Sequence, residues 1–315
     1  MKKDGTHPLC FVFGALRSGT TMFRLMLNNH PDLFSPGEAD FLFDYLNPNE
    51  THPSGWRYDI EGLLKNRIFR AHNLNIPQNC DGVDLLVDFL DQLQGQGTGM
   101  LILNVHRHAR KIATLQPDAK FIHLIRDGRD VAFSSIGMGW AGNSYYGVDH
   151  WIETEAVWDQ LAARIPSSQR ATLKFENLMG DIETELSRIC DFLEIPFDPV
   201  ILEYHRNSSY APPNPAIAQQ WKRRASARNI SLIEGKCADL LQARGYTLNG
   251  KAIVPNAFER AWLFCTHRVN RWRFNIRRFG IGFFLKSRLM QLVGTQQIRD
   301  RVRLQQDAKI TKLLK

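Results

Sequence analysis

The stretch VFGALRSGTTMFRLMLNNHP (residues 12–31) decides the fold of this chain, which has 315 residues. An apolar run ends at Gly14, a loop containing Arg17 follows, and apolar residues then recur at helical spacing. Gly19 allows the backbone to turn closely around an anion, and the start of the next helix adds partial positive charge. The order of strand, loop and helix therefore predicts a phosphate-binding loop after a buried parallel strand.

The loop differs from the nucleotide-binding loop of P-loop NTPases, G-x-x-x-x-G-K-[ST]. Gly14 and Gly19 have the required spacing, but Thr20 stands where that motif has its lysine. No strand-terminal aspartate is evident as a ligand for Mg²⁺. We therefore expect a phosphate cradle without ATP hydrolysis, in which Arg17 supplies the permanent charge and residues 18–21 supply backbone N–H groups. A purely structural turn is the alternative.

Predicted strands and helices alternate along the chain. Strands are expected at residues 9–13, 101–103, 119–127 and 170–178, and helices at residues 20–29, 84–93, 151–165 and 181–195. Residues 128–138 are expected to form a turn that enters a helix. Such alternation indicates an α/β protein with a parallel sheet. We expect a P-loop-like three-layer fold, with a central parallel sheet flanked by helices and followed by a C-terminal helical extension.

A second basic segment, FIHLIRDGRDVAFSS (residues 121–135), places Arg126 at the end of the clearest predicted strand and Ser134 eight residues later. If the next helix begins at Asp130 or Val131, Ser134 lies about one turn inside it. Ligands of open parallel sheets bind beyond the carboxyl ends of the strands. Arg126 is therefore expected beside the first loop, so that the two segments hold two phosphate groups.

Four segments in this order resemble the sulfotransferases that use 3′-phosphoadenosine 5′-phosphosulfate (PAPS), and most closely the bacterial and Golgi-type branch that includes the tyrosylprotein sulfotransferases. RSGTTMFRLMLNNHP is similar to the family's 5′-phosphosulfate loop, and FIHLIRDGRDVAFSS is similar to its 3′-phosphate loop. LKFENLMGDIETELSRICDFLEIPFDP resembles the strand and helix that the family places next. QQWKRRASARNISLIEGKCADLLQARGY resembles its closing segment, so the resemblance covers about residues 8–247.

The resemblance implies transfer of a sulfuryl group from PAPS to an acceptor hydroxyl or amine, with adenosine 3′,5′-bisphosphate as the product and no metal. An in-line displacement of this kind is helped by fixed donors at the leaving oxygen. Glu38 stands 21 residues after Arg17, about the interval of the catalytic glutamate in the tyrosylprotein branch, and is the expected general base. The residues expected to bind the cofactor are Arg17, Ser18, Gly19, Thr20, Thr21, Arg126 and Ser134, with one or more of Trp221, Lys222, Arg223 and Arg224 closing over it.

Residues 104–106 depart from the family pattern. Relatives commonly have Lys-Thr/Asp-Pro there, with the lysine near the transferred sulfonate, whereas this chain has Asn-Val-His. Either His106, Arg107 or His108 takes the lysine's role as an acceptor or sulfonate contact. The alternatives are that Arg17 acts with less help, or that the segment is only a basic helix start near the surface.

Charge is unevenly distributed along the chain. The net charge is +8, but residues 251–315 contain 15 Lys and Arg against 3 Asp and Glu, so the remainder is mildly acidic. From Phe258 onward, apolar residues recur at helical steps beside arginines, which suits an amphipathic helix on an anionic membrane surface. Packing on the catalytic body or on a second subunit is an alternative, and binding of a polyanionic acceptor is a third. Nucleic acid is not expected, because no recognition motif accompanies the charge.

The expected organisation has two parts. Residues 1–250 form a PAPS-binding sulfotransferase domain, in which residues 39–100 shape the acceptor pocket, and residues 251–315 form a basic amphipathic helical extension. The first residues are interpreted as the approach to the first strand rather than as a signal peptide. The five widely spaced cysteines indicate a reduced, cytoplasmic protein, peripheral at the inner membrane face if the extension binds lipid.

Several functional alternatives stay open. The acceptor is a small molecule, a glycan or a glycolipid; membrane contact through residues 258–290 and a homodimer are both compatible with the sequence. A PAPS-fold protein that binds anions without catalysis is suggested by the missing lysine at residues 104–106. A P-loop nucleotide kinase is disfavoured, because the loop lysine and a Mg²⁺ ligand are absent from the motif.

Overall fold

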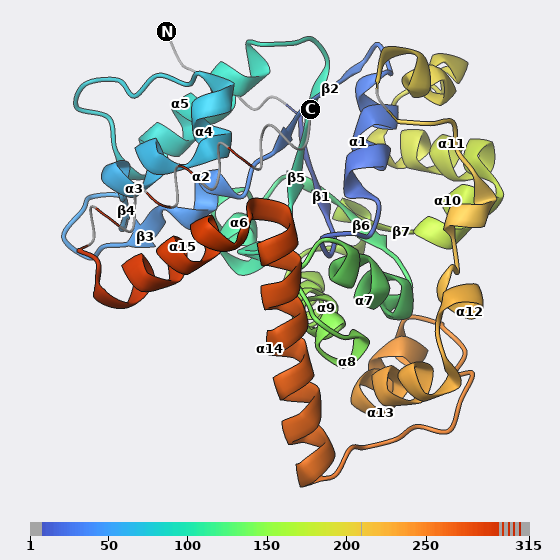
Figure 1. The fold of residues 1–315 in the computed structure, drawn as a ribbon. Coiled ribbons are helices and arrows are strands. Elements are labelled where there is room, and N and C mark those ends of the chain that lie inside the picture. The colour runs from blue at the N-terminus through green and yellow to red at the C-terminus, as the bar shows by residue number, and fades with distance from the viewer. Residues whose placement is uncertain are drawn as a thin grey trace, which may run out of the picture.

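A five-stranded sheet forms the centre of the molecule (Figure 1). The computed structural model describes residues 8–208 and 210–295, together with residues 298, 302, 305 and 309. In spatial order the strands are β2 (Leu33–Glu38), β5 (Met100–Val105), β1 (Leu9–Phe13), β6 (Lys120–Ile125) and β7 (Arg170–Lys174). Every neighbouring pair runs parallel, which confirms the predicted α/β class.

Helices cover both faces of the sheet and give the three layers expected. Phe11 and Phe13 of β1 pack into one hydrophobic cluster, and Cys10 and Val12 pack into another, because successive side chains of a strand point to opposite faces. The Phe11 face is covered by α2 (Phe41–Asp44), α3 (Ile60–Lys65), α4 (Arg67–His72), α5 (Gly82–Gln94), α6 (Ala109–Leu115) and α9 (Asp149–Ala162). The Val12 face is covered by α1 (Thr20–Asn28), α10 (Phe175–Gly180) and α11 (Ile182–Leu193).

Further elements gather near the carboxyl ends of β1 and β6. A third cluster packs α7 (Gly128–Gly137) and α9 against α13 (Ala227–Ala243), and α8 (Ser144–Gly147) lies between α7 and α9. The chain reaches α13 from α11 through two short 3₁₀ segments, η2 (Pro199–Asn207) and η3 (Pro215–Ile217), and the short helix α12 (Trp221–Arg224). A small antiparallel hairpin, β3 (Leu46–Pro48) with β4 (Trp56–Tyr58), and the 3₁₀ segment η1 (Ser167–Gln169) complete the body.

Two local predictions differ from the structure. α7 begins at Gly128 rather than at Asp130 or Val131, because the Asp127 side chain accepts a hydrogen bond from the Arg129 N–H and caps the helix. The strand expected at residues 170–178 ends at Lys174, and its second half forms the first turn of α10.

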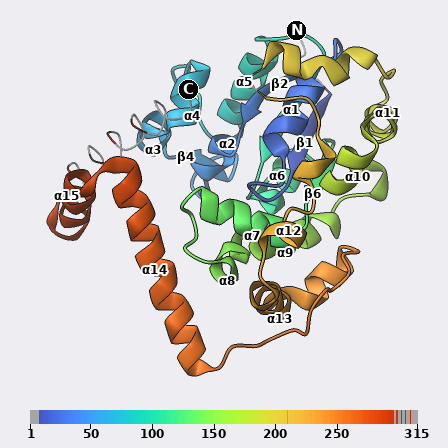
Figure 2. The same cartoon turned by 45° about the vertical axis from the view of Figure 1, so that its right-hand side comes forward.

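The described part of the C-terminal region forms two helices, as expected for a helical extension. α14 (Ala257–Phe279) begins at a capping box formed by Asn256 and Glu259, and α15 (Ile281–Val293) follows directly after Gly280. Both ribbon views show α14 reaching outward from the body, with α15 turning away at its end (Figures 1 and 2). Among the described residues, none of the helices combines the length and apolarity that crossing a bilayer requires.

Candidate active site

The predicted phosphate loop connects β1 to α1 at the carboxyl edge of the sheet. Arg17 and Gly19 both have left-handed backbones, with φ values of 76° and 96°. A side chain at Gly19 would place its Cβ 2.5 Å from the Phe175 ring, so only glycine fits there. The left-handed Arg17 carries backbone strain of about 1–3 kcal/mol, and strain of this kind collects at binding sites.

The loop presents backbone donors at the start of α1. Gly19 occupies the N-cap and offers no side-chain acceptor, so the N–H groups of the first turn have no side-chain cap. Ser18 differs from the prediction: its N–H donates to the Ala15 carbonyl at 3.0 Å and is used inside the loop. The Ser18 Oγ is fully buried and has no partner among the described residues. The donors available to an anion therefore begin at Gly19.

The two basic segments meet at this edge. The Arg17 Nε donates to the Ser134 Oγ at 3.0 Å, and the Arg126 Nη1 donates to the Arg17 carbonyl at 3.4 Å. The Arg126 guanidinium lies 4.5 Å from the centre of the Phe175 ring, which holds it by cation–π attraction. Three predicted phosphate ligands that are far apart in sequence thus lie together.

Two adjoining pockets share the arginines. The first, here the Ser134 pocket, has a volume of about 440 Å³ and is lined by Arg17, Arg126 and Ser134 with residues of α7 and α12. The second, the Phe175 pocket, has a volume of about 320 Å³ and is lined by Arg17, Arg126 and Phe175 with Gly19 to Met22 and part of residues 210–217. Arg17 and Arg126 therefore face a divided space with room for more than one anionic group.

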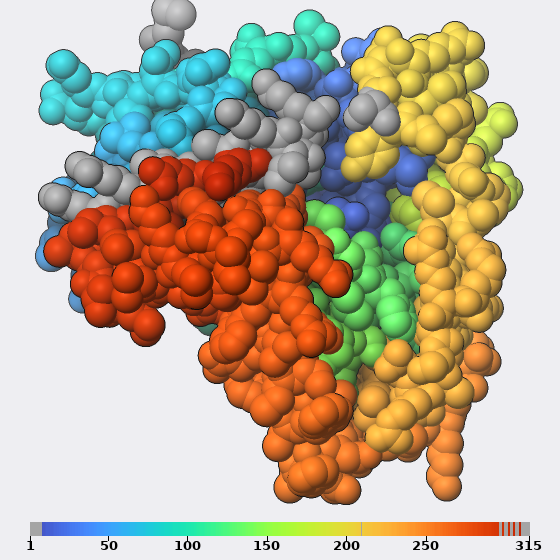
Figure 3. Space-filling view, in the orientation of Figure 1, coloured from blue at the N-terminus to red at the C-terminus, as the bar shows by residue number. Residues whose placement is uncertain are grey.

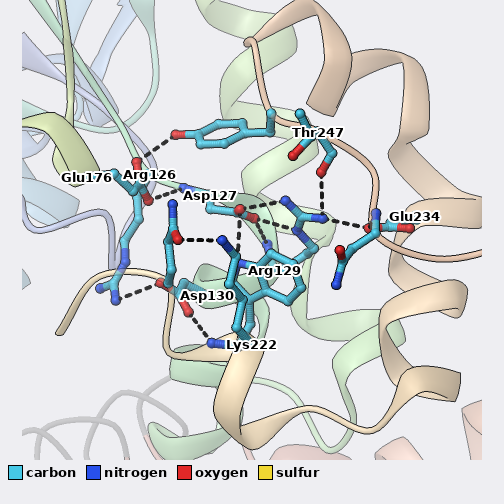
Figure 4. A network of polar contacts seen from close by, with 12 residues as sticks. Arg126, Asp127, Arg129, Asp130, Glu176, Lys222, Glu234 and Thr247 are labelled. Carbon is cyan, nitrogen blue, oxygen red and sulfur yellow. Dashed lines mark hydrogen bonds and ion pairs between the residues drawn. The ribbon is translucent and has the colours of Figure 1, made fainter. Parts of the chain in front are cut away.

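A buried ionic network (Figure 4) adjoins the Ser134 pocket, to whose lining it contributes Arg126 and Asp130. The Arg129 guanidinium pairs with Asp127 at 2.7 Å and with Glu234 of α13 at 2.6 Å, and all three side chains are almost fully buried. Burial lowers the pKa of Arg129, but its bonds to the two carboxylates outweigh that effect and raise it. Asp130 accepts from the Arg126 Nη2 at 3.2 Å, so a fixed carboxylate orients the ligand-facing arginine.

The same network holds the predicted closing segment. The Trp221 N–H donates to Asp130 at 2.8 Å, its Nε1 donates to Asp127 at 3.0 Å, and its ring lies 3.8 Å from the Arg129 guanidinium. Trp221 and Arg224 line the Ser134 pocket. Lys222 and Arg223 do not, because they donate to Gln219 and to the Ala216 carbonyl within their own segment. The sequence could not distinguish residues 221–224 from one another, and the structure shows that the first and the last of them line the pocket.

Glu38 lies in a third pocket on the other side of α1. This Glu38 pocket has a volume of about 360 Å³. Glu38 is the last residue of β2, it is exposed, and it pairs in register with Asn104 of β5, which also lines the pocket. Thr21 lines both the Glu38 pocket and the Phe175 pocket. The candidate base and the phosphate loop therefore share a wall.

Three cationic or titratable residues of this pocket escaped the sequence reasoning: Arg24, Arg67 and His72. Burial lowers the pKa of Arg24, whose Nη1 donates to the Ser35 carbonyl at 3.2 Å, and burial also lowers the pKa of His72. The three-residue spacing of Thr21 and Arg24 on a predicted helix was a usable signal, because such residues share a face. Arg67 and His72 belong to the short helix α4, which no pattern connected with Glu38.

His106 and His108, the predicted sulfonate contacts in the segment 104–108, lie in different surroundings. The His106 Nδ1 donates to the Gly14 carbonyl at 2.7 Å, and its Nε2 is buried without a partner among the described residues, close to the loop but outside the Glu38 pocket. His108 instead lies 2.7 Å from Asp44, which Arg107 also binds. Burial raises the pKa of Asp44, but hydrogen bonds from His108 and Arg107 outweigh burial and lower it. The structure therefore does not bring His108 to the Glu38 pocket.

The comparisons with known proteins agree with this geometry. The protein-family model described as "Sulfotransferase family" matches residues 8–199. A putative protein-tyrosine sulfotransferase of Caenorhabditis briggsae is 28% identical over 208 residues, which cover 62% of this chain and 69% of that protein. The protein-tyrosine sulfotransferase of Drosophila melanogaster is 23% identical over 218 residues, and the chain spans only 40% of its length.

A solved structure resembles the fold. The sulfotransferase domain from the Synechococcus PCC 7002 olefin synthase has a TM-score of 0.57 at 20% sequence identity, over 79% of this chain and 99% of that domain. At this identity the likeness concerns the fold alone, and it agrees with the three-layer arrangement. Since the family match spans more than half of the chain, this protein belongs to the sulfotransferase family, as the sequence resemblance predicted.

Proposed function

We propose that the chain moves the sulfuryl group of PAPS to an acceptor hydroxyl, with an acceptor amine as the second possibility, and that Glu38 is the general base. The observation that supports this most directly is the shared wall at Thr21, which lies between the arginine-lined Phe175 pocket and the Glu38 pocket. A donor and an acceptor bound on either side of Thr21 would have their reacting atoms next to each other.

The residues present fit a ligand with two phosphate groups. Arg17 and Arg126 line two adjoining pockets, and Ser134 adds a hydroxyl to one of them. The Arg126 Nε is buried and has no partner among the described residues, although its other nitrogens are bonded. An unpaired buried donor of this kind costs free energy unless a ligand satisfies it. We propose Arg126 and Ser134 for the 3′-phosphate, with Trp221 and Arg224 beside it.

The loop between β1 and α1 would bind the 5′-phosphate. PAPS supplies the sulfuryl group and leaves as adenosine 3′,5′-bisphosphate, so one S–O bond to the 5′-phosphate breaks as one to the acceptor forms. Arg17 and the N–H groups from Gly19 onward hold the leaving phosphate oxygen, where negative charge grows. Glu38 takes the acceptor proton. His106 would make the sulfonate contact that a lysine makes in relatives only as an imidazolium, because its Nδ1 proton is already donated to Gly14 and the Nε2 must carry a second proton. The proposal needs no metal.

The acceptor pocket supports an acceptor that carries negative charge near its hydroxyl. Residues 39–100 contribute Arg67 and His72, and α1 contributes Arg24. The Arg67 side chain forms no ion pair with the described residues, and Arg24 bonds only to a backbone carbonyl. An acidic glycan or glycolipid suits these charges. The curated relatives are named as protein-tyrosine sulfotransferases, so a tyrosine hydroxyl is the second acceptor to test.

We also propose the surrounding organisation. Residues 1–250 would act as the catalytic domain and residues 251–315 as an extension. A cytoplasmic setting is supported by Cys10, Cys190 and Cys237, which are buried thiols; burial raises the pKa of Cys190 to about 11 and that of Cys237 to about 12, so both stay protonated and unreactive. The extension would contact the inner membrane face through residues 258–290. A homodimer stays a weaker proposal.

The decisive experiment is Glu38→Gln. Labelled PAPS is first incubated with lysate fractions of lipids, glycans and peptides to find an acceptor, and turnover is then compared between variants. We expect turnover to fall about 10²–10⁴-fold, the usual contribution of a general base, while calorimetry shows unchanged binding of adenosine 3′,5′-bisphosphate. The exposed Glu50→Gln is the matched control.

Three other results would count against the proposal. Retained turnover in Glu38→Gln would show that Glu38 is not the general base. Bisphosphate binding without label transfer to any fraction would favour a non-catalytic binding protein. Tight binding of ATP with Mg²⁺, and none of the bisphosphate, would favour a nucleotide kinase.

A further inference from the structure

The helix α14 packs on the body through polar residues and through Phe274, whose ring lies against Gly139. The Gly142 N–H donates to His267 at 3.2 Å, Asn270 donates to the Gly142 carbonyl at 2.9 Å, and Asn143 donates to Thr266 at 3.2 Å. Thr266, His267 and Asn270 lie on one side of the helix by their spacing. The space-filling view shows the orange residues of this helix against the green residues of the body (Figure 3).

The opposite side of α14 is aromatic and faces outward. With the exposed Cys265, its residues follow alternating steps of four and three, and the exposed fractions of the large ones are high: Phe258 82%, Trp262 65%, Val269 40% and Trp272 38%. α15 adds Ile281, Leu285, Leu289 and Leu292, which are all more than half exposed. A helix on a soluble protein normally buries its apolar stripe. Here the stripe is turned away from the protein, and we call this exposed surface of α14 and α15 the aromatic face.

The charges around the aromatic face are of one sign. Residues 260–295 contain eight Lys and Arg and no Asp or Glu. The Arg268 guanidinium lies 5.6 Å from the centres of the Phe264 and Trp272 rings, and Arg288 lies 5.7 Å from those of Trp272 and Phe284. Among the described residues, the one ion pair that α14 or α15 makes joins Glu259 to Arg228 near the start of α14. The arginines therefore accompany the aromatic rings and are not neutralised by the protein.

We infer that the aromatic face binds the surface of an anionic lipid bilayer. Tryptophan and phenylalanine rings settle at the level of the lipid headgroups, and arginines beside them meet the negative headgroups. A second copy of the chain is a poor occupant, because it would bring the same positive charge against this one. This inference develops the membrane contact proposed above, and it does not depend on sulfuryl transfer.

The location of the face gives the inference a consequence for the site. α14 packs on residues 139–143, which directly follow Met138 of the Ser134 pocket. A bilayer bound by the aromatic face would lie on the far side of α14 from this segment, so α14 would stand between the bilayer and the segment that borders the Ser134 pocket.

Vesicle flotation with the full chain tests the inference. We expect the protein to float with phosphatidylcholine vesicles that contain phosphatidylserine, to stay unbound with phosphatidylcholine alone, and to be released by high salt. Arg271→Glu with Arg273→Glu should weaken binding at least about tenfold, because each basic residue near the surface contributes about a fivefold factor. Phe258→Ser with Trp262→Ser should weaken it as well.

Matched variants elsewhere on the surface control for charge and for exposed apolar area. Arg110→Glu with Arg164→Glu makes the same charge change on the body, and Leu64→Ser with Val87→Ser removes exposed apolar side chains outside the aromatic face. These should bind vesicles as the parent chain does. Bisphosphate affinity, measured on every variant, shows that the body is folded.

Three outcomes would overturn the inference. One is no binding to phosphatidylserine vesicles at low salt by a chain that binds the bisphosphate. Another is equal loss of binding in the control variants. The third is a parent chain that is a dimer by light scattering and becomes a monomer in Phe258→Ser with Trp262→Ser, since the aromatic face would then be an interface between copies. Failure of turnover in every acceptor fraction would leave the vesicle result unaffected.

Discussion

The two halves of the sheet's carboxyl edge are built differently. On the β1 and β6 side, the protein fixes its arginines by hydrogen bonds: the Arg17 Nε bonds to Ser134, and the Arg126 Nη2 bonds to Asp130. On the β2 and β5 side, the side chains of Glu38 and Arg67 are exposed and form no bond with the described residues. The β1 and β6 side is therefore preorganised for one ligand, whereas the charged side chains of the β2 and β5 side are free to bind a ligand. This difference suits an invariant cofactor on one side and a particular acceptor on the other.

Arg126→Ala should have the largest effect, and it should act on the β1 and β6 side alone. The variant would remove the charge that we propose for the 3′-phosphate and would leave Asp130 without its cation, so we expect bisphosphate affinity to fall about 100-fold or more by calorimetry. Arg24→Ala, on the acceptor side, is the control and should keep the parent affinity. Equal losses in the two variants would show that the two sides are one electrostatic site.

Ser134→Ala should have the next largest effect. Loss of one hydroxyl donor to a phosphate is expected to weaken bisphosphate binding about tenfold. The adjacent Ser135→Ala is a close control, because the Ser135 Oγ donates to the Val131 carbonyl inside α7 and does not line the pocket. If both serines gave the same change, the effect would come from helix stability and not from phosphate binding.

Arg67→Ala tests whether the Glu38 pocket binds an acceptor with negative charge. The residue is exposed, so its attraction to an anionic acceptor is screened, and we expect KM for the acceptor to rise a few-fold with kcat unchanged. Arg70→Ala, on the same helix but outside the pocket, should leave KM as it is. An unchanged KM in Arg67→Ala would mean that the acceptor carries no charge near this position.

Asp44→Asn should change stability and leave catalysis alone. The pKa of Asp44 is held below its ordinary value in the fold, so its stabilising effect is present above about pH 4 and is lost as pH falls through the lower, folded value. Since Arg107 is half exposed, the variant should lose about 1 kcal/mol of unfolding free energy at neutral pH and almost none in strong acid. Urea unfolding at both pH values measures this. A large loss of turnover would instead make His108 part of the site.

The sequence could indicate which residues of the arginine-lined side lie together, for a physical reason. A phosphate grip uses consecutive backbone N–H groups, so its residues must be contiguous, as Gly14 to Thr21 are, and a glycine marks the turn. Arg126 could be placed beside them because parallel strands all end at one edge. The fold followed from the same logic, since β1 is apolar at every position and is buried on both faces.

The acceptor side could not be assembled in this way. Arg24 comes from α1, which packs on the Val12 face of the sheet, whereas Arg67 and His72 come from α4, which packs on the Phe11 face. No local pattern encodes that meeting. Even the Trp221 segment, which the sequence identified, could not be resolved into pocket-lining and outward residues, because Asp127 and Asp130 hold it through contacts about ninety residues apart in the chain.

The bond between Arg17 and Ser134 bears on how fast the enzyme can work. Each group is already satisfied before the nucleotide arrives, so binding exchanges one hydrogen bond for others, and departure restores the original. In the proposed reaction, departure of the bisphosphate would leave neither the Arg17 Nε nor the Ser134 hydroxyl unpaired. This exchange would favour product release, the step that limits turnover in many enzymes.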